Sequence, residues 1–279
     1  MTWNIVCDSS GDMLPAELVP GKIFLKVAPL TLLVGEKEYV DDETLDVPQL
    51  LAHMASEKGP SSTACPSPEA FAQAFSSADC SLCFAISGNL SGTYNAACLG
   101  RDMVLEEHPE KKIHVVDTCS TSGSLCLLTE LAVELIQADV PFEEICRRLD
   151  QERDDQRTVF TLECFDNLVK NGRMKPLLGT ILQGLGIHVI ADATPVGTIR
   201  VVDKARGEKR TYRHMIEYMK KEKDCIGRHV VISHCQNLEG AFRLKEAILA
   251  ALPVKKVSFL ECRGLTTFYA MEKGLIVVY

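Results

Sequence analysis

Short apolar runs alternate with amphipathic segments through the first 155 residues. The apolar runs predict buried strands, at residues 3–7, 23–34, 82–86 and 113–116. The amphipathic segments predict helices, at residues 47–54, 68–75, 94–101, 124–137 and 142–149. A Gly35-Glu36 turn after the second run predicts a hairpin with residues 38–40. Strands that alternate with helices are typical of an α/β domain with a parallel sheet.

The pattern changes after a charged segment at residues 151–157. Later strands are predicted at residues 158–161, 187–191, 198–202, 229–234, 257–262 and 275–279. Later helices are predicted at residues 164–169, 177–185, 212–222 and 239–252. The turn at 194–197 indicates a hairpin, so this part reads as an α+β domain with a mixed or antiparallel sheet. We therefore expect two domains, residues 1–157 and 158–279.

Hydroxyl-rich segments stand at three places where a helix is about to begin. They are Asp8-Ser9-Ser10, Ser62-Thr63 within an extended loop at 60–68, and Ser87 to Tyr94. The first N–H groups of a helix lack partners and favour negative charge, so such segments suit an anion. Two interpretations stay open: the three segments line one crevice, or each is an independent helix cap.

Composition narrows the classes of partner. The 279 residues carry a formal net charge of −8, which argues against a nucleic-acid partner. No apolar run approaches the ~20 residues of a membrane span, and the first residues lack signal-peptide features, so we expect a cytoplasmic protein. The 12 cysteines are scattered, with one CxxC at Cys80 and Cys83, and we expect buried thiols with no metal and no cofactor.

Enzyme chemistry receives little support from the motifs. The chain has no G-x-S-x-G elbow and no GxxxxGK[ST] loop, and His234 is the best candidate for a base. A stand-alone hydrolase or phosphotransferase using Ser91 or Asp117 is the alternative hypothesis. A binding protein needs less, because burial of roughly fifteen methylenes at ~0.8 kcal/mol each gives on the order of 12 kcal/mol before costs.

Six segments form an ordered series over nearly the whole chain. They are Asp8-Ser9-Ser10, residues 63–68 (T-A-C-P-S-P), 87–94 (S-G-N-L-S-G-T-Y), 116–118 (V-D-T), 168–173 (L-V-K-N-G-R) and 204–207 (K-A-R-G). Together they resemble motifs of the DegV family of bacterial fatty-acid-binding proteins, whose members include the FakB subunits of fatty acid kinase.

The resemblance implies two α/β domains with one long-chain fatty acid in a tunnel between them. It implies that the carboxylate is bound by Thr63 with Ser91, and that Ser62 or Ser87 lies close by, with Gly92 in the same loop. It also implies a separate ATP-dependent kinase that phosphorylates the bound acid, so that this chain would present a substrate and not be an enzyme. Arg173 resembles the arginine associated with kinase engagement.

Two departures from the family pattern lie near the expected head-group site. The usual H-x-G-x-G segment is absent, and Tyr269 stands where its histidine is expected; a tyrosine hydroxyl donates a hydrogen bond but carries no positive charge near neutral pH. The L-x-I-K-P motif reads Leu-Gly-Ile-His-Val at 185–189. These changes leave open a different acyl ligand, a member without a kinase partner, or a regulatory role through protein contacts.

Overall fold

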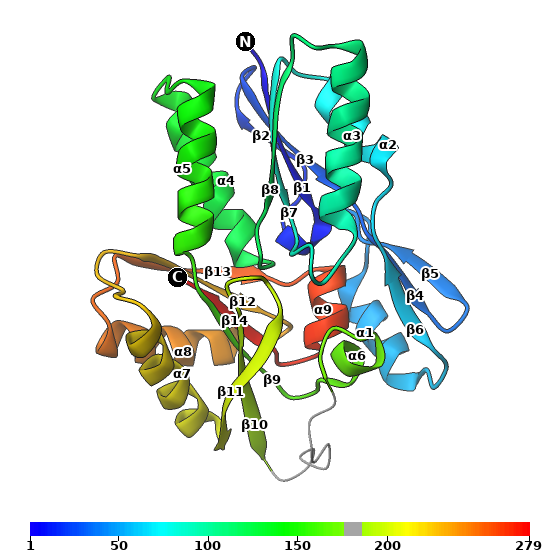
Figure 1. The fold of residues 1–279 in the computed structure, drawn as a ribbon. Helices are drawn as coiled ribbons and strands as arrows, with labels where there is room; N and C mark the ends of the chain where they lie inside the picture. Colours follow the sequence, from blue (N-terminus) through cyan, green and yellow to red (C-terminus); the bar gives the residue numbers. More distant parts are fainter. Residues whose placement is uncertain (176–185) are drawn as a thin grey trace.

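The computed structural model describes residues 1–175 and 186–279, which form three β-sheets and their covering helices (Figure 1). The helix predicted at 177–185 lies outside the described residues. None of the helices described is long and apolar enough to span a membrane.

The first sheet is the predicted α/β sheet. Its strands, in spatial order, are β2 (Ala16–Val19), β3 (Ile23–Ala28), β1 (Trp3–Asp8), β7 (Cys80–Ala85) and β8 (Lys112–Asp117). The last four are mutually parallel, and β2 is an antiparallel edge. Helices cover both faces, namely α4 (Gly123–Gln137) and α5 (Phe142–Asp155) on one, and α2 (Pro68–Ser76) and α3 (Thr93–Glu107) on the other (Figure 1). Coverage of both faces explains the nearly continuous apolar strands.

A separate antiparallel sheet contains parts of two segments for which the sequence predicts a different structure, namely one strand at residues 23–34 and a loop at residues 60–68. Its strands are β5 (Lys37–Val40), β4 (Thr31–Val34) and β6 (Ser61–Ala64). The β4–β5 hairpin is confirmed, but the predicted strand at 23–34 is divided at Pro29, which has no N–H for a ladder. The extended loop predicted at 60–68 contains strand β6, where Thr63 lies opposite Leu32 of β4.

The second large sheet is mixed, as predicted. Its strands, in order, are β11 (Ile199–Arg206), β10 (Ile187–Ala193), β9 (Thr158–Leu162), β14 (Leu275–Val278), β12 (His229–His234) and β13 (Lys256–Glu261). Only β12 and β13 run parallel among these neighbours, and the predicted β10–β11 hairpin is confirmed. Helices α7 (Glu208–Glu222) and α8 (Leu238–Ala251) pack on one face in a shared core.

A short helix that the sequence did not predict joins the two halves of the chain. Helix α9 (Gly264–Ala270) packs through Leu265 and Phe268 against the small sheet and against Leu50 of α1 (Val47–Ser56). Asp41 accepts hydrogen bonds from the backbone N–H groups of Gly264 and Leu265, at 2.8 and 2.7 Å. The remaining short elements are η1 (Ser9–Gly11) and α6 (Asp166–Lys170).

Candidate functional site

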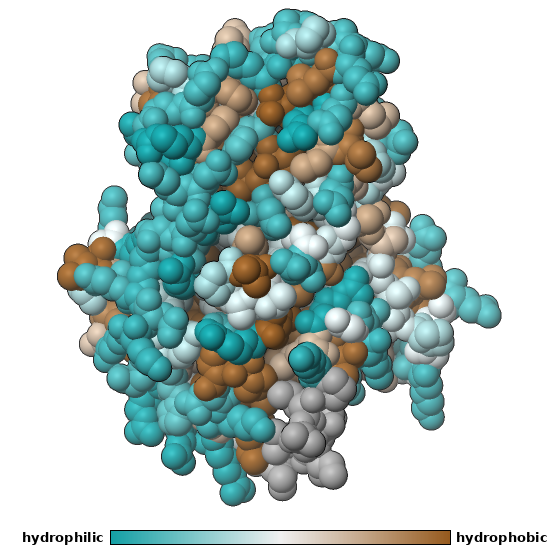
Figure 2. Space-filling view, viewed as in Figure 1, coloured by the Kyte–Doolittle hydropathy of each residue, from teal (hydrophilic) through white to brown (hydrophobic). Residues whose placement is uncertain are grey.

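A mostly apolar cavity lies between the first sheet and the second. About 820 Å³ in this region is free of atoms, a volume that includes space open to solvent. Its apolar lining comes from both halves of the chain: Leu30, Ile86, Leu90, Phe160, Leu162, Leu168, Ile199, Leu265, Ala270 and Ile276. The β10–β11 hairpin forms one wall, and Figure 2 shows hydrophobic residues on the outer surface of this region. The cavity therefore suits a long apolar ligand.

Among the polar residues of the lining, Thr63 of β6, Arg173 after α6 and Tyr269 of α9 contact one another, and Arg173 bonds to the residue before Ser91, which precedes α3; we call these four residues the polar cluster. The lining also contains the hydroxyl residues Ser120, Thr121, Thr158 and Thr266. The hydroxyls of Thr63 and Tyr269 lie 2.9 Å apart in a hydrogen bond. The Arg173 guanidinium carbon lies 6.0 Å from the centre of the Tyr269 ring. Arg173 Nε donates to the carbonyl of Leu90, beside Ser91, at 3.0 Å. Chain segments more than 200 residues apart thus meet at one point.

Arg173 carries the only formal charge among the described residues that line the cavity. A guanidinium stays protonated at any physiological pH. Its assigned hydrogen bonds go to the backbone carbonyls of Leu90 and Asn171, and no carboxylate in the described part of the chain forms an ion pair with it. An uncompensated cation at the end of an apolar cavity favours a ligand with a negative head group.

Ser91 lies at the start of helix α3. Its hydroxyl forms a 2.8 Å hydrogen bond with the hydroxyl of Thr93 and accepts from the Thr93 N–H at 3.4 Å. Gly92 occupies the N-cap position of α3 and has no side chain to accept from the N–H groups of this helix end. The first N–H groups of α3 therefore lie next to the polar cluster, where they add positive potential.

The other predicted binding residues do not line the cavity. Ser87 is buried, and its hydroxyl donates to the carbonyl of Gly197 at 2.8 Å, while the Asn89 amide donates to the carbonyl of Val196 at 2.7 Å. Ser87 thus attaches its loop to the β10–β11 turn. Ser62 neighbours Thr63 on β6, so its side chain points to the opposite face of that strand. The structure brings Thr63, Ser91 and Tyr269 to the cavity and places Ser62, Ser87 and Gly92 outside its lining.

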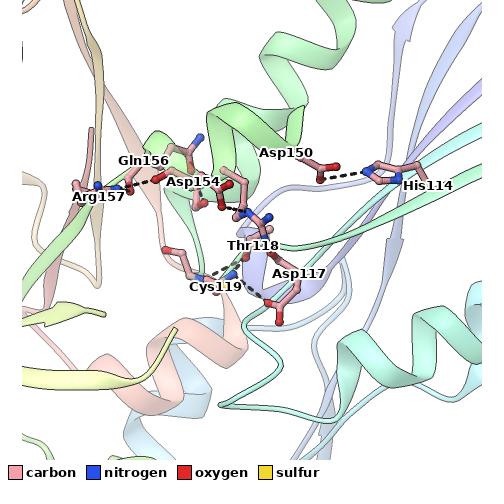
Figure 3. Close-up of polar contacts among 11 residues, drawn as sticks. His114, Asp117, Thr118, Cys119, Asp150, Asp154, Gln156 and Arg157 are labelled. Carbon is pink, nitrogen blue, oxygen red and sulfur yellow. Dashed lines mark hydrogen bonds and ion pairs between the residues drawn. The ribbon is translucent and has the colours of Figure 1, made fainter. Parts of the chain in front are cut away.

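The alternative enzyme residues have local roles in the structure. The Asp117 carboxylate accepts a hydrogen bond from the N–H of Cys119 at 3.0 Å (Figure 3). It also accepts from the N–H of Gly88 at 3.1 Å, and so ties two strand-end loops together. No histidine is among the described residues that line the cavity, so Ser91 has no base of that type beside it there. Within residues 1–175 and 186–279, no group of three or more His, Cys, Asp or Glu could hold a metal ion.

The segment Asp8-Ser9-Ser10 is buried and does not line the cavity. Asp8 accepts from the N–H groups of Ser10 and Ile86, at 2.9 and 2.7 Å. Asp12 accepts from the N–H of Arg263 at 2.7 Å and from the Ser122 hydroxyl. Burial raises the pKa of Asp8 to about 6 and the pKa of Asp12 to about 7. This segment fits the cap interpretation, since it links the first sheet to the segment before α9.

Substitution of Asp12 by asparagine should flatten the dependence of stability on pH. The raised pKa means that the folded state holds a proton that the unfolded state releases near pH 4, so the free energy of unfolding falls as pH rises from about 4 to 7. The asparagine side chain keeps an acceptor for the Arg263 N–H and does not titrate. Urea unfolding measures this change. Between about pH 4 and pH 7, the free energy of unfolding should fall by at least about 1 kcal/mol less in Asp12→Asn than in the wild type. Asp139→Asn, at an exposed carboxylate, is the control, and equal slopes for all three proteins would contradict the prediction.

Fold and site together define a three-sheet α/β protein with a mostly apolar cavity whose one charged lining residue is a cation. The family model described as an uncharacterised protein of the DegV family matches residues 2–277, so the chain belongs to the DegV family. A DegV domain-containing protein of Streptococcus pyogenes serotype M1 is 35% identical over 279 residues, which cover 100% of this chain and 99% of that protein.

Solved structures agree with this assignment. The Streptococcus pneumoniae fatty acid kinase (Fak) B3 protein, crystallised with linoleic acid, superposes with a TM-score of 0.95 at 34% identity and covers 100% of this chain and 99% of its own. A DegV family protein from Eubacterium eligens, loaded with heptadecanoic acid, gives a TM-score of 0.93 at 30% identity, with 99% of each chain covered. The family and fold expected from the six motifs are therefore confirmed.

Proposed function

We propose that this protein buries one long-chain fatty acid in the cavity between its two domains, residues 1–157 and 158–279. The acyl chain would lie along the apolar lining, and the carboxylate would lie at the polar cluster. The observation that carries the proposal is the Arg173 cation, the single charge of the described lining, which lies beside the hydrogen-bonded pair of Thr63 and Tyr269. The fatty acids bound by the Streptococcus pneumoniae and Eubacterium eligens proteins support it.

Each end of the ligand has a separate energetic role in this proposal. Burial of about fifteen methylenes contributes on the order of 12 kcal/mol, which must offset an association cost of about 4–15 kcal/mol. The tail therefore supplies most of the affinity. The charge-assisted hydrogen bond from Arg173, with the hydroxyls of Thr63, Ser91 and Tyr269, sets the direction of the ligand in the cavity.

The surrounding residues act through the ones that touch the ligand. Ser87 and Gly92 would position the loop that carries Ser91, because Ser87 holds that loop to the Gly197 carbonyl. Ser62 continues the strand that presents Thr63. Tyr269 stands where the family motif has a histidine. Its hydroxyl, which is oriented by the hydrogen bond with Thr63, would donate to the carboxylate without a positive charge.

We further propose that the chain is a binding subunit, without a reaction of its own, that presents its fatty acid to a separate ATP-dependent fatty acid kinase in the cytoplasm. Similarity to the Streptococcus pneumoniae Fak B3 protein, at 34% identity over the whole chain, supports this role. The kinase would transfer a phosphoryl group from ATP to the bound carboxylate, which yields an acyl phosphate and ADP. Arg173 lies near the head group and would also be close to that partner.

One two-stage experiment tests both parts. Native mass spectrometry of the purified protein should show a mass excess of one fatty acid, which organic extraction removes. The loaded protein is then incubated with ATP and the catalytic subunit of a bacterial fatty acid kinase, and acyl phosphate is measured against extracted protein as the control. Apo protein that takes up no fatty acid would refute the binding proposal. A loaded protein that yields no acyl phosphate would refute only the kinase role.

A further inference from the structure

A second cavity adjoins the apolar one, and we call it the polar cavity. About 850 Å³ in this region is free of atoms, a volume that includes space open to solvent. Its lining comes from the loop after β8, the end of α5, the β10–β11 hairpin, helix α7 and the residue after β14. Four residues line both cavities, namely Cys119, Ser120, Thr158 and Ala193. The hydroxyls of Ser120 and Thr158 form a 2.8 Å hydrogen bond in this shared wall.

Two buried side chains that line the polar cavity have a polar atom without a partner. Tyr279 is 1% exposed and Gln156 is 7% exposed. In the described part of the chain, neither the Tyr279 hydroxyl nor Gln156 Nε2 has a hydrogen-bond partner, although Gln156 Oε1 accepts from the Ser124 hydroxyl. A buried polar atom that stays unpaired lowers stability, so it calls for an explanation. Both atoms can donate a hydrogen bond to a ligand in this cavity.

Arg157 adds a cation to these two donors. Its backbone N–H donates to the Tyr279 carbonyl at 2.9 Å, and the Tyr279 N–H donates to the Arg157 carbonyl at 3.0 Å. The two residues therefore lie directly opposite each other in an antiparallel pair, with their side chains on the same face of the sheet. Arg157 Nη1 donates to the carbonyls of Asp154 and Gln156, at 2.8 and 2.7 Å. A guanidinium has further N–H donors, which remain for a ligand.

The two carboxylates that lie close to basic groups in this lining are already compensated. Asp192 accepts from Arg200 Nε at 3.1 Å and from the Tyr218 hydroxyl at 2.6 Å. The Asp154 carboxylate lies 2.7 Å from Arg153 Nε in an ion pair. Neither carboxylate is therefore a free anion that would repel a negatively charged ligand.

The charges that remain in the lining are those of Glu222, which is exposed, and of Arg157. No carboxylate in residues 1–175 and 186–279 forms an ion pair with Arg157, whose assigned hydrogen bonds go to carbonyls. The unused groups in the buried part of the cavity are thus all hydrogen-bond donors, and one of them is a cation. Such a set favours a ligand that accepts several hydrogen bonds and carries negative charge.

We propose that the polar cavity binds a small oxyanion, the phosphate or carboxylate group of a metabolite. Its oxygens accept hydrogen bonds from the Arg157 guanidinium, the Tyr279 hydroxyl and Gln156 Nε2. None of these three residues lines the apolar cavity, so the oxyanion occupies a site separate from that of the fatty acid. The inference is independent of the proposed function.

Titration calorimetry of the full chain with inorganic phosphate, at an ionic strength held constant with chloride, tests the site. The wild type should bind one phosphate per chain. Tyr279→Phe and Arg157→Gln should each raise the dissociation constant by about tenfold or more, because each removes a donor to a charged acceptor. Arg148→Gln, at an exposed arginine of α5 that pairs with Glu144, is the control for charge. Tyr212→Phe, at a buried tyrosine outside this lining, is the control for the hydroxyl, and both controls should keep the wild-type affinity.

Thermal unfolding separates a ligand site from a site filled by water. Without phosphate, Tyr279→Phe should keep the wild-type Tm, since its hydroxyl has no partner to lose, and phosphate should raise the Tm of the wild type more than that of the variant. A Tyr279→Phe variant that unfolds at a lower Tm without phosphate and binds phosphate as the wild type does would show that ordered water occupies the hydroxyl. That result would overturn the inference.

Titration with acetate distinguishes the two sources of the oxyanion. Tighter binding of phosphate identifies a phosphate group, and tighter binding of acetate identifies a carboxylate; either supports the site when Tyr279→Phe and Arg157→Gln weaken it. The inference is overturned if neither anion binds saturably up to about 10 mM. It is also overturned if both variants bind as tightly as the wild type, because the anion is then an adventitious ion only.

Discussion

Replacement of Arg173 by glutamine should weaken the binding of a long-chain fatty acid by about tenfold to a hundredfold. The guanidinium is the only formal charge of the described cavity lining, and a hydrogen bond to a charged group contributes about 1.5–3 kcal/mol. Glutamine preserves part of the length and polarity of the side chain but leaves the carboxylate without a counter-charge. Titration calorimetry on delipidated protein measures the change directly.

Three comparisons distinguish a head-group role for Arg173 from a general loss of structure. Lys170→Gln removes an exposed positive charge from the same segment and should leave the affinity unchanged. Arg173→Lys should fall between the wild type and Arg173→Gln, because lysine keeps the charge and loses the planar donor geometry. A fatty alcohol of the same chain length should bind wild type and Arg173→Gln about equally. If the alcohol loses as much affinity as the acid, Arg173 does not act on the carboxylate.

The sequence predicted the large elements because each is encoded locally. The strands at 3–7, 82–86 and 113–116 are continuous apolar runs, and that pattern results from burial on both faces. Strand β2 escaped detection because its residues at the sheet edge are half-buried or exposed and so do not alternate. The sequence predicts a loop where strand β6 lies, because the segment is short, rich in serine and followed by prolines. Its pairing with β4 depends on residues about 30 positions away. Helix α9 is too short to show a helical period.

The candidate site was predictable in its residue types but not in its contacts. Hydroxyl-rich segments and the family resemblance selected Thr63, Ser91 and Tyr269, and all three line the cavity in the structure. The hydrogen bond between Thr63 and Tyr269 spans 206 positions, and no local pattern records it. Ser87 has the same chemistry as Ser91, yet its hydroxyl is used by the Gly197 carbonyl 110 positions later. Only the folded chain shows that the Ser91 hydroxyl lines the cavity whereas the Ser87 hydroxyl is bonded to a carbonyl outside it.

The contact between Ser87 and Gly197 explains why that turn needs glycine. Gly197 has a φ of +75°, in the left-handed region that side chains disfavour. A Cβ at this position would lie 2.8 Å from Cys119 Cα and 2.9 Å from Ser87 Cβ, closer than real Cβ atoms approach other atoms. The turn is thus pressed against two strand-end loops of the first sheet, and any side chain must push them apart at the cavity wall.

Gly197→Ala should therefore lower the free energy of unfolding by about 3 kcal/mol, the upper end of the ~1–3 kcal/mol typical of left-handed strain, since a steric clash adds to the strain. Gly227→Ala is the matched control, because Gly227 has a similar φ of +68° but no atom within 4 Å of the added Cβ, and its loss should be only about 1 kcal/mol. Urea unfolding of both variants separates strain from clash. Because Gly197 lines the cavity, its variant should also bind fatty acid more weakly, whereas Gly227→Ala should not. Equal losses of stability in the two variants would show that the close approach to Ser87 and Cys119 costs nothing.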